Sequence, residues 1–148
     1  RILEQKKIDY KSYEYGGTLA ISGVEVASVL SQDPNRVFKT LVTIGNSKSN
    51  YVFMIPVHKE LDLKKAAKSV GEKSIAMIKS KELLPLTGYV HGGCSPIGMK
   101  KQFKTVIDIS ATGFDTILFS GGKIGYQVEV ALEELKKVVN YECFDVVV

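Results

Sequence analysis

The stretch VFKTLVTI at residues 37–44, followed by GNSKSN at residues 45–50 and YVFMIPV at residues 51–57, decides the fold. Two runs rich in β-branched and aromatic residues flank a six-residue polar turn, which predicts a β-hairpin. In the first run Lys39 lies among apolar neighbours, and strand alternation places its side chain on the face opposite Phe38 and Thr40. Because burial of an unpaired ammonium is costly, Lys39 is either an edge lysine whose stem reaches solvent or a residue with a function.

The rest of the chain predicts further strands, with helices scattered between them. Asp62 and Gly71 are a helix cap and a helix stop on either side of an apolar stripe, so a helix is expected between them. Similar patterns predict strands at residues 7–15, 74–78, 105–109, 116–120, 126–130 and 143–148, and helices at residues 22–30, 80–84 and 131–138. Many strands without regular βαβ alternation predict an α+β fold with a mixed, curled sheet, in a single domain over residues 1–148.

Composition places the chain among soluble globular domains. Of its 148 residues, 45% are apolar and 24% are charged, and no run approaches the roughly 18 apolar residues of a membrane span. The first seven residues carry too much charge for the core of a signal peptide, so we expect a cytoplasmic protein without a membrane partner. Two cysteines are too few for a disulfide framework.

Charge is unevenly distributed along the chain. Residues 59–104 contain ten lysines against four acidic residues, a local balance of +6, whereas residues 126–148 have a balance of −3. Such an asymmetry suits a polyanion that approaches one side, because lysines attract nucleic acid through its phosphates. A solvated helix face is the alternative explanation.

Two glycine-rich segments are the strongest candidates for a functional site: GYVHGGCSPIG at residues 88–98, the glycine loop, and SGGKIG at residues 120–125, the SGG turn. The SGG turn departs from a phosphate-binding loop, since Ile117 and Ile124 stand where that motif needs Gly and Ser or Thr. A plain turn between strands is an alternative of equal weight.

The glycine loop also contains an H-x-x-C pair, His91 and Cys94. It could provide half of a metal site, or a thiolate nucleophile activated by the histidine. The other candidate ligands, His58 and Cys143, have no local partner, so we expect neither a metal nor another cofactor.

Five segments together resemble the signature blocks of the YbaK family of aminoacyl-tRNA deacylases, in the order of that family. They are VFKTL at 37–41, LDLKK at 61–65, TGYVHGGCSPIG at 87–98, TVID at 105–108 and SGGKIG at 120–125. The resemblance covers nearly the whole chain and is strongest to the bacterial branch whose members hydrolyse Cys-tRNA(Pro). It implies a barrel-like sheet flanked by helices, with a cleft lined by the lysine strand, the glycine loop and the SGG turn.

The resemblance also assigns residues. It implies catalytic roles for Lys39, Gly92, Gly93 and Ser120, and substrate-binding roles for Tyr15, Ser22, Thr40, Ser95, Gly121, Gly122 and Gln127. Three positions depart from the best-known pattern of the family. Ser22 stands where the family usually has an aromatic residue, Gln127 stands where some members have an aspartate, and Cys94 stands where the loop usually has an aliphatic residue. These changes concern the shape of the pocket, and hence its amino-acid preference.

The implied activity is editing, the destruction of a wrongly charged tRNA that a synthetase cannot refuse by binding alone. The substrate is the acceptor end of an aminoacyl-tRNA, and prolyl-tRNA synthetase is a candidate partner. Glycine amides would stabilise the oxyanion, while the cysteinyl thiol would attack its own ester carbonyl and release the 3′ hydroxyl of the tRNA, so that the amino acid leaves as a cyclic thiolactone. The alternatives are a deacylase of the Ala-tRNA(Pro) type, an enzyme with Cys94 as its nucleophile, and a non-catalytic RNA- or nucleotide-binding module.

Overall fold

The structure is a computed structural model that describes residues 2–14, 30, 32–90 and 92–148. The predicted helix at residues 22–30, apart from Leu30, lies outside these residues. So do the predicted site residues Tyr15 and Ser22, together with His91.

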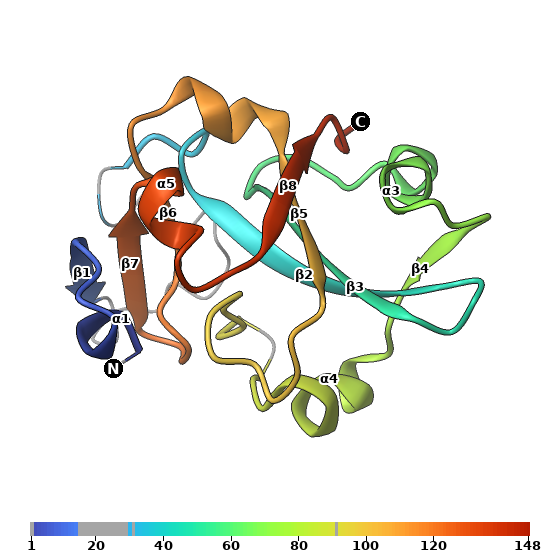
Figure 1. Cartoon of the computed structure of the whole chain (residues 1–148), viewed down its shortest axis with the longest axis horizontal. Coiled ribbons are helices and arrows are strands. Elements are labelled where there is room, and N and C mark those ends of the chain that lie inside the picture. Colours follow the sequence, from blue (N-terminus) through green and yellow to red (C-terminus); the bar gives the residue numbers. More distant parts are fainter. Residues whose placement is uncertain (1, 15–29, 31, 91) are drawn as a thin grey trace.

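The strands form two sheets (Figure 1). The smaller has the order β1-β7-β6 and the larger β4-β2-β3-β5-β8. The strands are β1 (Tyr10–Glu14), β2 (Phe38–Gly45), β3 (Asn50–Pro56), β4 (Ile75–Met77), β5 (Lys104–Asp108), β6 (Ile117–Ser120), β7 (Tyr126–Val130) and β8 (Tyr141–Phe144). The helices are α1 (Ile2–Gln5), α3 (Leu63–Val70), α4 (Ser80–Thr87), the 3-10 helix η1 (Ile109–Gly113) and α5 (Leu132–Leu135). No described helix has the length and apolar character needed to cross a membrane.

The predicted hairpin is confirmed as β2 and β3, which pair antiparallel from Phe38 opposite Pro56 to Ile44 opposite Asn50. The larger sheet is mixed, as predicted, because β3 and β5 pair in parallel, as do β5 and β8. The α+β class is therefore confirmed, whereas the single curled sheet is replaced by two sheets. They are joined by one parallel bridge, between Val37 and Leu118, and by the hydrogen bond from Leu118 N to Arg36 O at 2.9 Å.

Side chains that alternate along β2 and β3 pack into two hydrophobic clusters, one on each face of the hairpin. Phe38 and Met54 face a cluster shared with the smaller sheet, which includes Phe119. On the opposite face, Phe53 and Ile55 pack against the buried alanines of α3. That helix is capped as predicted, since the Asp62 carboxylate accepts from Lys64 N at 3.0 Å and from Lys65 N at 3.1 Å, and Gly71 ends it at φ 74°.

Several elements differ from the prediction: α4 runs to Thr87 instead of residue 84, β8 begins at Tyr141 instead of residue 143, and neither α1 nor η1 was predicted. Helix α5 ends at Leu135 instead of residue 138, and the Tyr141 hydroxyl donates to one of its carbonyls, that of Leu132, at 2.8 Å. Strand β8 ends at Phe144, because the N–H of Val146 donates to the buried Asp108 carboxylate at 3.1 Å instead of continuing the ladder.

Candidate active site

The glycine loop and the SGG turn, 22 residues apart in sequence, lie against each other. A Cβ on Gly93 would lie 3.0 Å from both Ile124 N and Lys123 Cα, and a Cβ on Gly122 would lie 3.2 Å from the Tyr89 ring. Real Cβ atoms rarely approach backbone this closely, so Gly93 permits a contact that any other residue would disturb. The structure thus brings together the two segments that the sequence singled out.

Hydrogen bonds within the SGG turn fix its shape. The N–H of Gly121 donates to Tyr126 O at 3.0 Å, and the N–H of Gly122 donates to Ser120 Oγ at 3.3 Å. Gly122 has φ +109°, a conformation that side chains with a Cβ rarely adopt. Ser120 Oγ accepts from this amide, so its own proton is available to donate to another group.

Hydrogen bonds of Ser95, Tyr89 and Gly93 hold the glycine loop in its conformation. Ser95 is 3% exposed and its Oγ accepts from Ile97 N at 3.2 Å, while the Tyr89 hydroxyl donates to the carbonyl of Ile97. The N–H of Gly93 donates to Val90 O at 3.0 Å, which closes a tight turn. This bond corrects the expectation that both glycine amides face the substrate, because the Gly93 amide already has an acceptor. Gly92 is exposed, with φ +86°.

Cys94 points into the protein interior, where it packs with Val42 and Val52. Burial raises the pKa of its thiol to about 12. A thiol in this environment stays protonated near neutral pH, so the structure contradicts the alternative in which Cys94 is a thiolate nucleophile.

Lys39 and Thr40 leave β2 on opposite faces. Lys39 is half-buried and pairs with Ile55. The isolated parallel bridge between Val37 and Leu118 lies two residues before Lys39 on one strand and two residues before Ser120 on the other. Thr40 Oγ1 is hidden from solvent and has no hydrogen-bond partner among the described residues. A buried hydroxyl without a partner is costly, which marks Thr40 as a group that a ligand or a water can satisfy.

Gln127 is held at the centre of the smaller sheet. It pairs with Ser120 on β6 and with Tyr13 on β1, and it is 3% exposed. Its Oε1 accepts from Gln32 Nε2 at 2.6 Å. Gln32 was not predicted as a site residue, and no motif around it in the sequence marks it.

Next to Gln127, a carboxylate joins three parts of the fold. Glu129 accepts from the Tyr13 hydroxyl at 2.7 Å and from Thr116 Oγ1 at 2.6 Å, and Arg36 Nη2 lies 3.6 Å from it. The hydrogen bond from Thr116 is the main cause that lowers the pKa of Glu129. These contacts anchor β1, β6 and the start of the lysine strand to β7.

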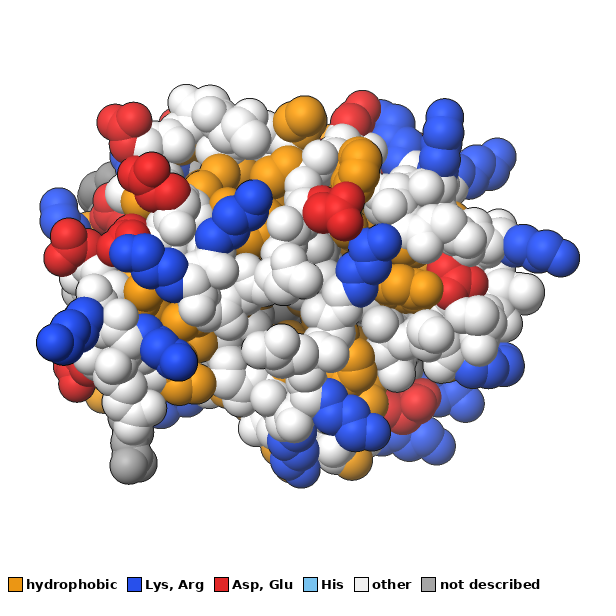
Figure 2. All heavy atoms as spheres, viewed as in Figure 1, with side chains coloured by type: hydrophobic (Ala, Val, Ile, Leu, Met, Phe, Trp, Pro, Cys, Tyr) orange, Lys and Arg blue, Asp and Glu red, His pale blue; other side chains and the backbone are white. Residues whose placement is uncertain are grey.

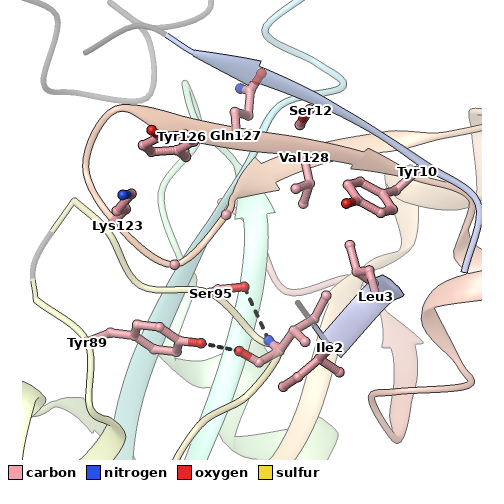
Figure 3. A pocket seen from close by; sticks show the side chains of 13 residues that line it. Ile2, Leu3, Tyr10, Ser12, Tyr89, Ser95, Lys123, Tyr126, Gln127 and Val128 are labelled. Carbon is pink, nitrogen blue, oxygen red and sulfur yellow. Dashed lines mark hydrogen bonds between the residues drawn. The ribbon is translucent and has the colours of Figure 1, made fainter. Parts of the chain in front are cut away.

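A cavity of about 420 Å³ lies between the smaller sheet, α1 and the two glycine segments (Figure 3). Four predicted site residues line it: Ser95, Gly121, Gly122 and Gln127. The other lining residues are Ile2, Leu3, Tyr10, Ser12, Tyr89, Ile97, Lys123, Tyr126 and Val128. Neither Lys39 nor Ser120 belongs to this lining, so the predicted residues are divided between the cavity and the strands beside it.

The surface charges follow the uneven distribution in the sequence. Figure 2 shows lysine side chains gathered toward the right and lower edges of the view, where Figure 1 places α3, β4, the β2–β3 turn and α4. Within the described part of the chain, no three His, Cys, Asp or Glu side chains form a group that could hold a metal ion.

Comparisons with known proteins identify the family of this chain. The sequence profile of the Aminoacyl-tRNA editing domain family matches residues 21–138. A protein of Enterococcus faecalis (strain ATCC 700802 / V583), named "Putative Cys-tRNA(Pro)/Cys-tRNA(Cys) deacylase EbsC", is 45% identical over 141 residues, 95% of this chain and 86% of that protein. The uncharacterized protein YwhH of Bacillus subtilis (strain 168) is 24% identical over 113 residues, 76% of this chain and 71% of that protein.

Solved structures show the same fold. The hypothetical protein APE2540 matches with a TM-score of 0.89 at 20% identity, covering 99% of this chain and 97% of that one. A structure described as "a putative trans-editing enzyme for prolyl tRNA synthetase" matches with a TM-score of 0.84 at 22% identity, covering 99% and 92%.

The fold is that of the matched solved structures, an α+β domain in which the two glycine segments lie against each other. The chain belongs to the Aminoacyl-tRNA editing domain family. This confirms the family predicted from the five sequence blocks and, with it, the predicted activity of an aminoacyl-tRNA deacylase.

Proposed function

We propose that this protein removes cysteine from Cys-tRNA(Pro) by cleavage of the ester between the amino acid and the terminal ribose. The name of the Enterococcus faecalis relative, 45% identical over 95% of the chain, supports cysteine as the cargo. The observation that carries the proposal is the contact between the glycine loop and the SGG turn, together with the bridge from Val37 to Leu118, which lies two residues before Lys39 and two before Ser120. We take residues 1–148 as one editing domain.

In the proposed reaction the nucleophile belongs to the substrate. The cysteinyl thiol gives up its proton, its sulfur bonds to the ester carbon, and the bond from that carbon to the ribose 3′ oxygen breaks. The 3′ oxygen takes up a proton, and the amino acid leaves as a thiolactone. Well-oriented intramolecular groups reach effective molarities of roughly 10⁵–10⁸ M, so correct placement can replace a protein nucleophile.

The roles of the protein are then positional and electrostatic. Lys39 would orient the terminal ribose or its phosphate and neutralise developing charge. Ser120 would donate its free proton to the ribose, or its oxygen would accept from the α-amino group. We assign the oxyanion contact to the Gly92 amide, since the Gly93 N–H already donates to Val90 O. In other enzymes the loss of one such donor costs about 10²–10³ in rate. Thr40 Oγ1, which lacks a partner among the described residues, is a further candidate donor to the substrate.

Incubation of the purified protein with Cys-tRNA(Pro) and with Ala-tRNA(Pro), followed by measurement of ester loss, tests the proposal. We expect Cys-tRNA(Pro) to be cleaved and Ala-tRNA(Pro), which has no thiol, to be spared. Lys39→Ala should lower the turnover of Cys-tRNA(Pro). Lys136→Ala, an exposed lysine outside the basic segment of residues 59–104, is the matched control and should retain it.

Three outcomes would contradict the proposal. Cleavage of Ala-tRNA(Pro) at the rate of Cys-tRNA(Pro) would identify the alanine-type deacylase instead. Binding of both tRNAs without cleavage would identify a binding module. Wild-type turnover by Lys39→Ala would remove that residue from the mechanism.

The partner and the location follow from this substrate. The described chain offers no evident reader of the anticodon, so we propose that prolyl-tRNA synthetase supplies the mischarged tRNA. Because aminoacyl-tRNA is made and used in the cytoplasm, we also propose that the protein works there.

A further inference from the structure

The cavity beside the SGG turn is too large for the amino acid that we propose as cargo. Its volume is about 420 Å³, within the range of roughly 300–1,000 Å³ found for sites that hold whole small molecules. A cysteine side chain has only one carbon and one sulfur beyond Cα, so a cavity of this size cannot select it by fit. Another part of the substrate is the better match.

The lining of the cavity has the chemistry of a nucleobase site. Three tyrosines contribute to it, Tyr10, Tyr89 and Tyr126, and Lys123 Nζ lies 4.2 Å from the centroid of the Tyr126 ring. Lys123 makes no ion pair within the described part of the chain. Aromatic side chains bind bases by stacking, and an ammonium donates to ring nitrogens or to phosphate.

The position of the cavity relates it to the proposed ester site. Figure 3 shows Gln127 and Val128 on opposite sides of β7, with Val128 directed toward the cavity. Paired residues of antiparallel strands point to the same face, so Ser120 shares the face of Gln127. Ser120 is thus directed away from Val128, while Gln127 and the next two residues of the turn, Gly121 and Gly122, line the cavity, so the ester site and the cavity adjoin at the SGG turn.

This arrangement matches the end of an aminoacyl-tRNA. In the terminal adenosine, the ribose carries the ester on one side and the base on another. A ribose bound at the SGG turn would place the ester near Ser120 and the base in the adjoining cavity. We propose that the cavity binds the adenine of the terminal adenosine, an inference that rests on the proposed function.

The test uses an uncharged RNA minihelix that ends in CCA, so that binding is measured without deacylation. Tyr126 is 36% exposed, so Tyr126→Ala should fold, which its melting temperature checks. Because the variant loses the stacking of the base on one aromatic residue, it should bind the minihelix about 5- to 140-fold more weakly than wild type. Lys123→Gln should weaken binding and reduce its dependence on salt. The matched control is Lys136→Gln, a lysine 5.4 Å from the Tyr141 ring, which should bind as wild type does.

A second set of minihelices identifies the base. Removal of the terminal adenine should weaken binding to the wild type by the same factor, and Tyr126→Ala should then cause no further loss. Wild-type binding by Tyr126→Ala would overturn the proposal. So would a loss that follows removal of the penultimate cytosine instead of the terminal adenine. Cys-tRNA(Pro) cleavage is measured in parallel, so that failure of the adenine site with intact cleavage is distinguished from failure of the deacylase assignment.

Discussion

Gly93→Ala tests the contact between the glycine loop and the SGG turn. The new Cβ would lie 3.0 Å from Ile124 N and from Lys123 Cα, and 3.2 Å from Lys123 C. All three are backbone atoms, so no side chain can rotate away and one of the two segments must move. Overpacking of this kind costs about 1–3 kcal/mol. For a chain of this length we expect the melting temperature to fall by about 2–12 °C.

The effect on activity should exceed the effect on folding. A displacement of the loop shifts the Gly92 amide relative to Ser120, and a misplacement of about 1 Å can cost on the order of 10²-fold in rate. We therefore expect kcat/KM for Cys-tRNA(Pro) to fall by about 10²-fold at a temperature where the variant is fully folded.

Gly113→Ala is the matched control for this substitution. Nothing lies within 4 Å of a Cβ at Gly113, and its φ is not positive, so stability and kcat/KM should stay at the wild-type level. Wild-type kcat/KM in Gly93→Ala would refute the argument that contact between the two segments positions the catalytic groups.

Other predictions concern three further residues. Cys94→Ala should keep kcat for Cys-tRNA(Pro) while it lowers stability slightly, because the thiol is buried and has a raised pKa; loss of turnover with intact folding would restore the nucleophile hypothesis. Thr40→Val should leave the melting temperature unchanged or higher, because it removes a buried hydroxyl without a described partner, yet lower kcat/KM about 10-fold; unchanged kcat/KM would show that the hydroxyl does not contact substrate. The pKa of Glu129 is lowered in the fold from its ordinary value of 4.5, so its stabilising contribution is complete above pH 4.5 and is lost as the pH falls through the lower folded value. Urea denaturation between pH 3 and 7 should show a smaller acid-side loss of stability in Glu129→Gln than in wild type, and identical pH profiles would contradict this assignment.

Most strands could be predicted because local signals agreed with tertiary packing. The hairpin, β2 and β3, has alternating apolar residues that serve one core on each face. Helix α3 has a cap and a stop residue that form the expected hydrogen bonds. The end of β8 could not be predicted, because it depends on a hydrogen bond from Val146 N to Asp108, 38 residues earlier in the chain.

The candidate site was partly predictable for the same reason. Glycine pairs, proline and serine mark both glycine segments locally, and Gly93 and Gly122 do permit the two segments to touch. Gln32 has no such mark, and Lys123 lies in the SGG turn without any local signal of its own role. The role of Gln32 depends on a partner 95 residues away, and that of Lys123 depends on a cavity built from several distant segments.

S-methylcysteinyl-tRNA(Pro) offers the most direct measurement of the central claim, that the sulfur of the substrate performs the attack. This substrate keeps the ester and the tRNA but blocks the sulfur. We predict that it competes with Cys-tRNA(Pro) for the enzyme and is cleaved at least about 10²-fold more slowly, because the intramolecular nucleophile is lost. Cleavage at the rate of Cys-tRNA(Pro) would contradict the account and require a nucleophile from the protein or from water.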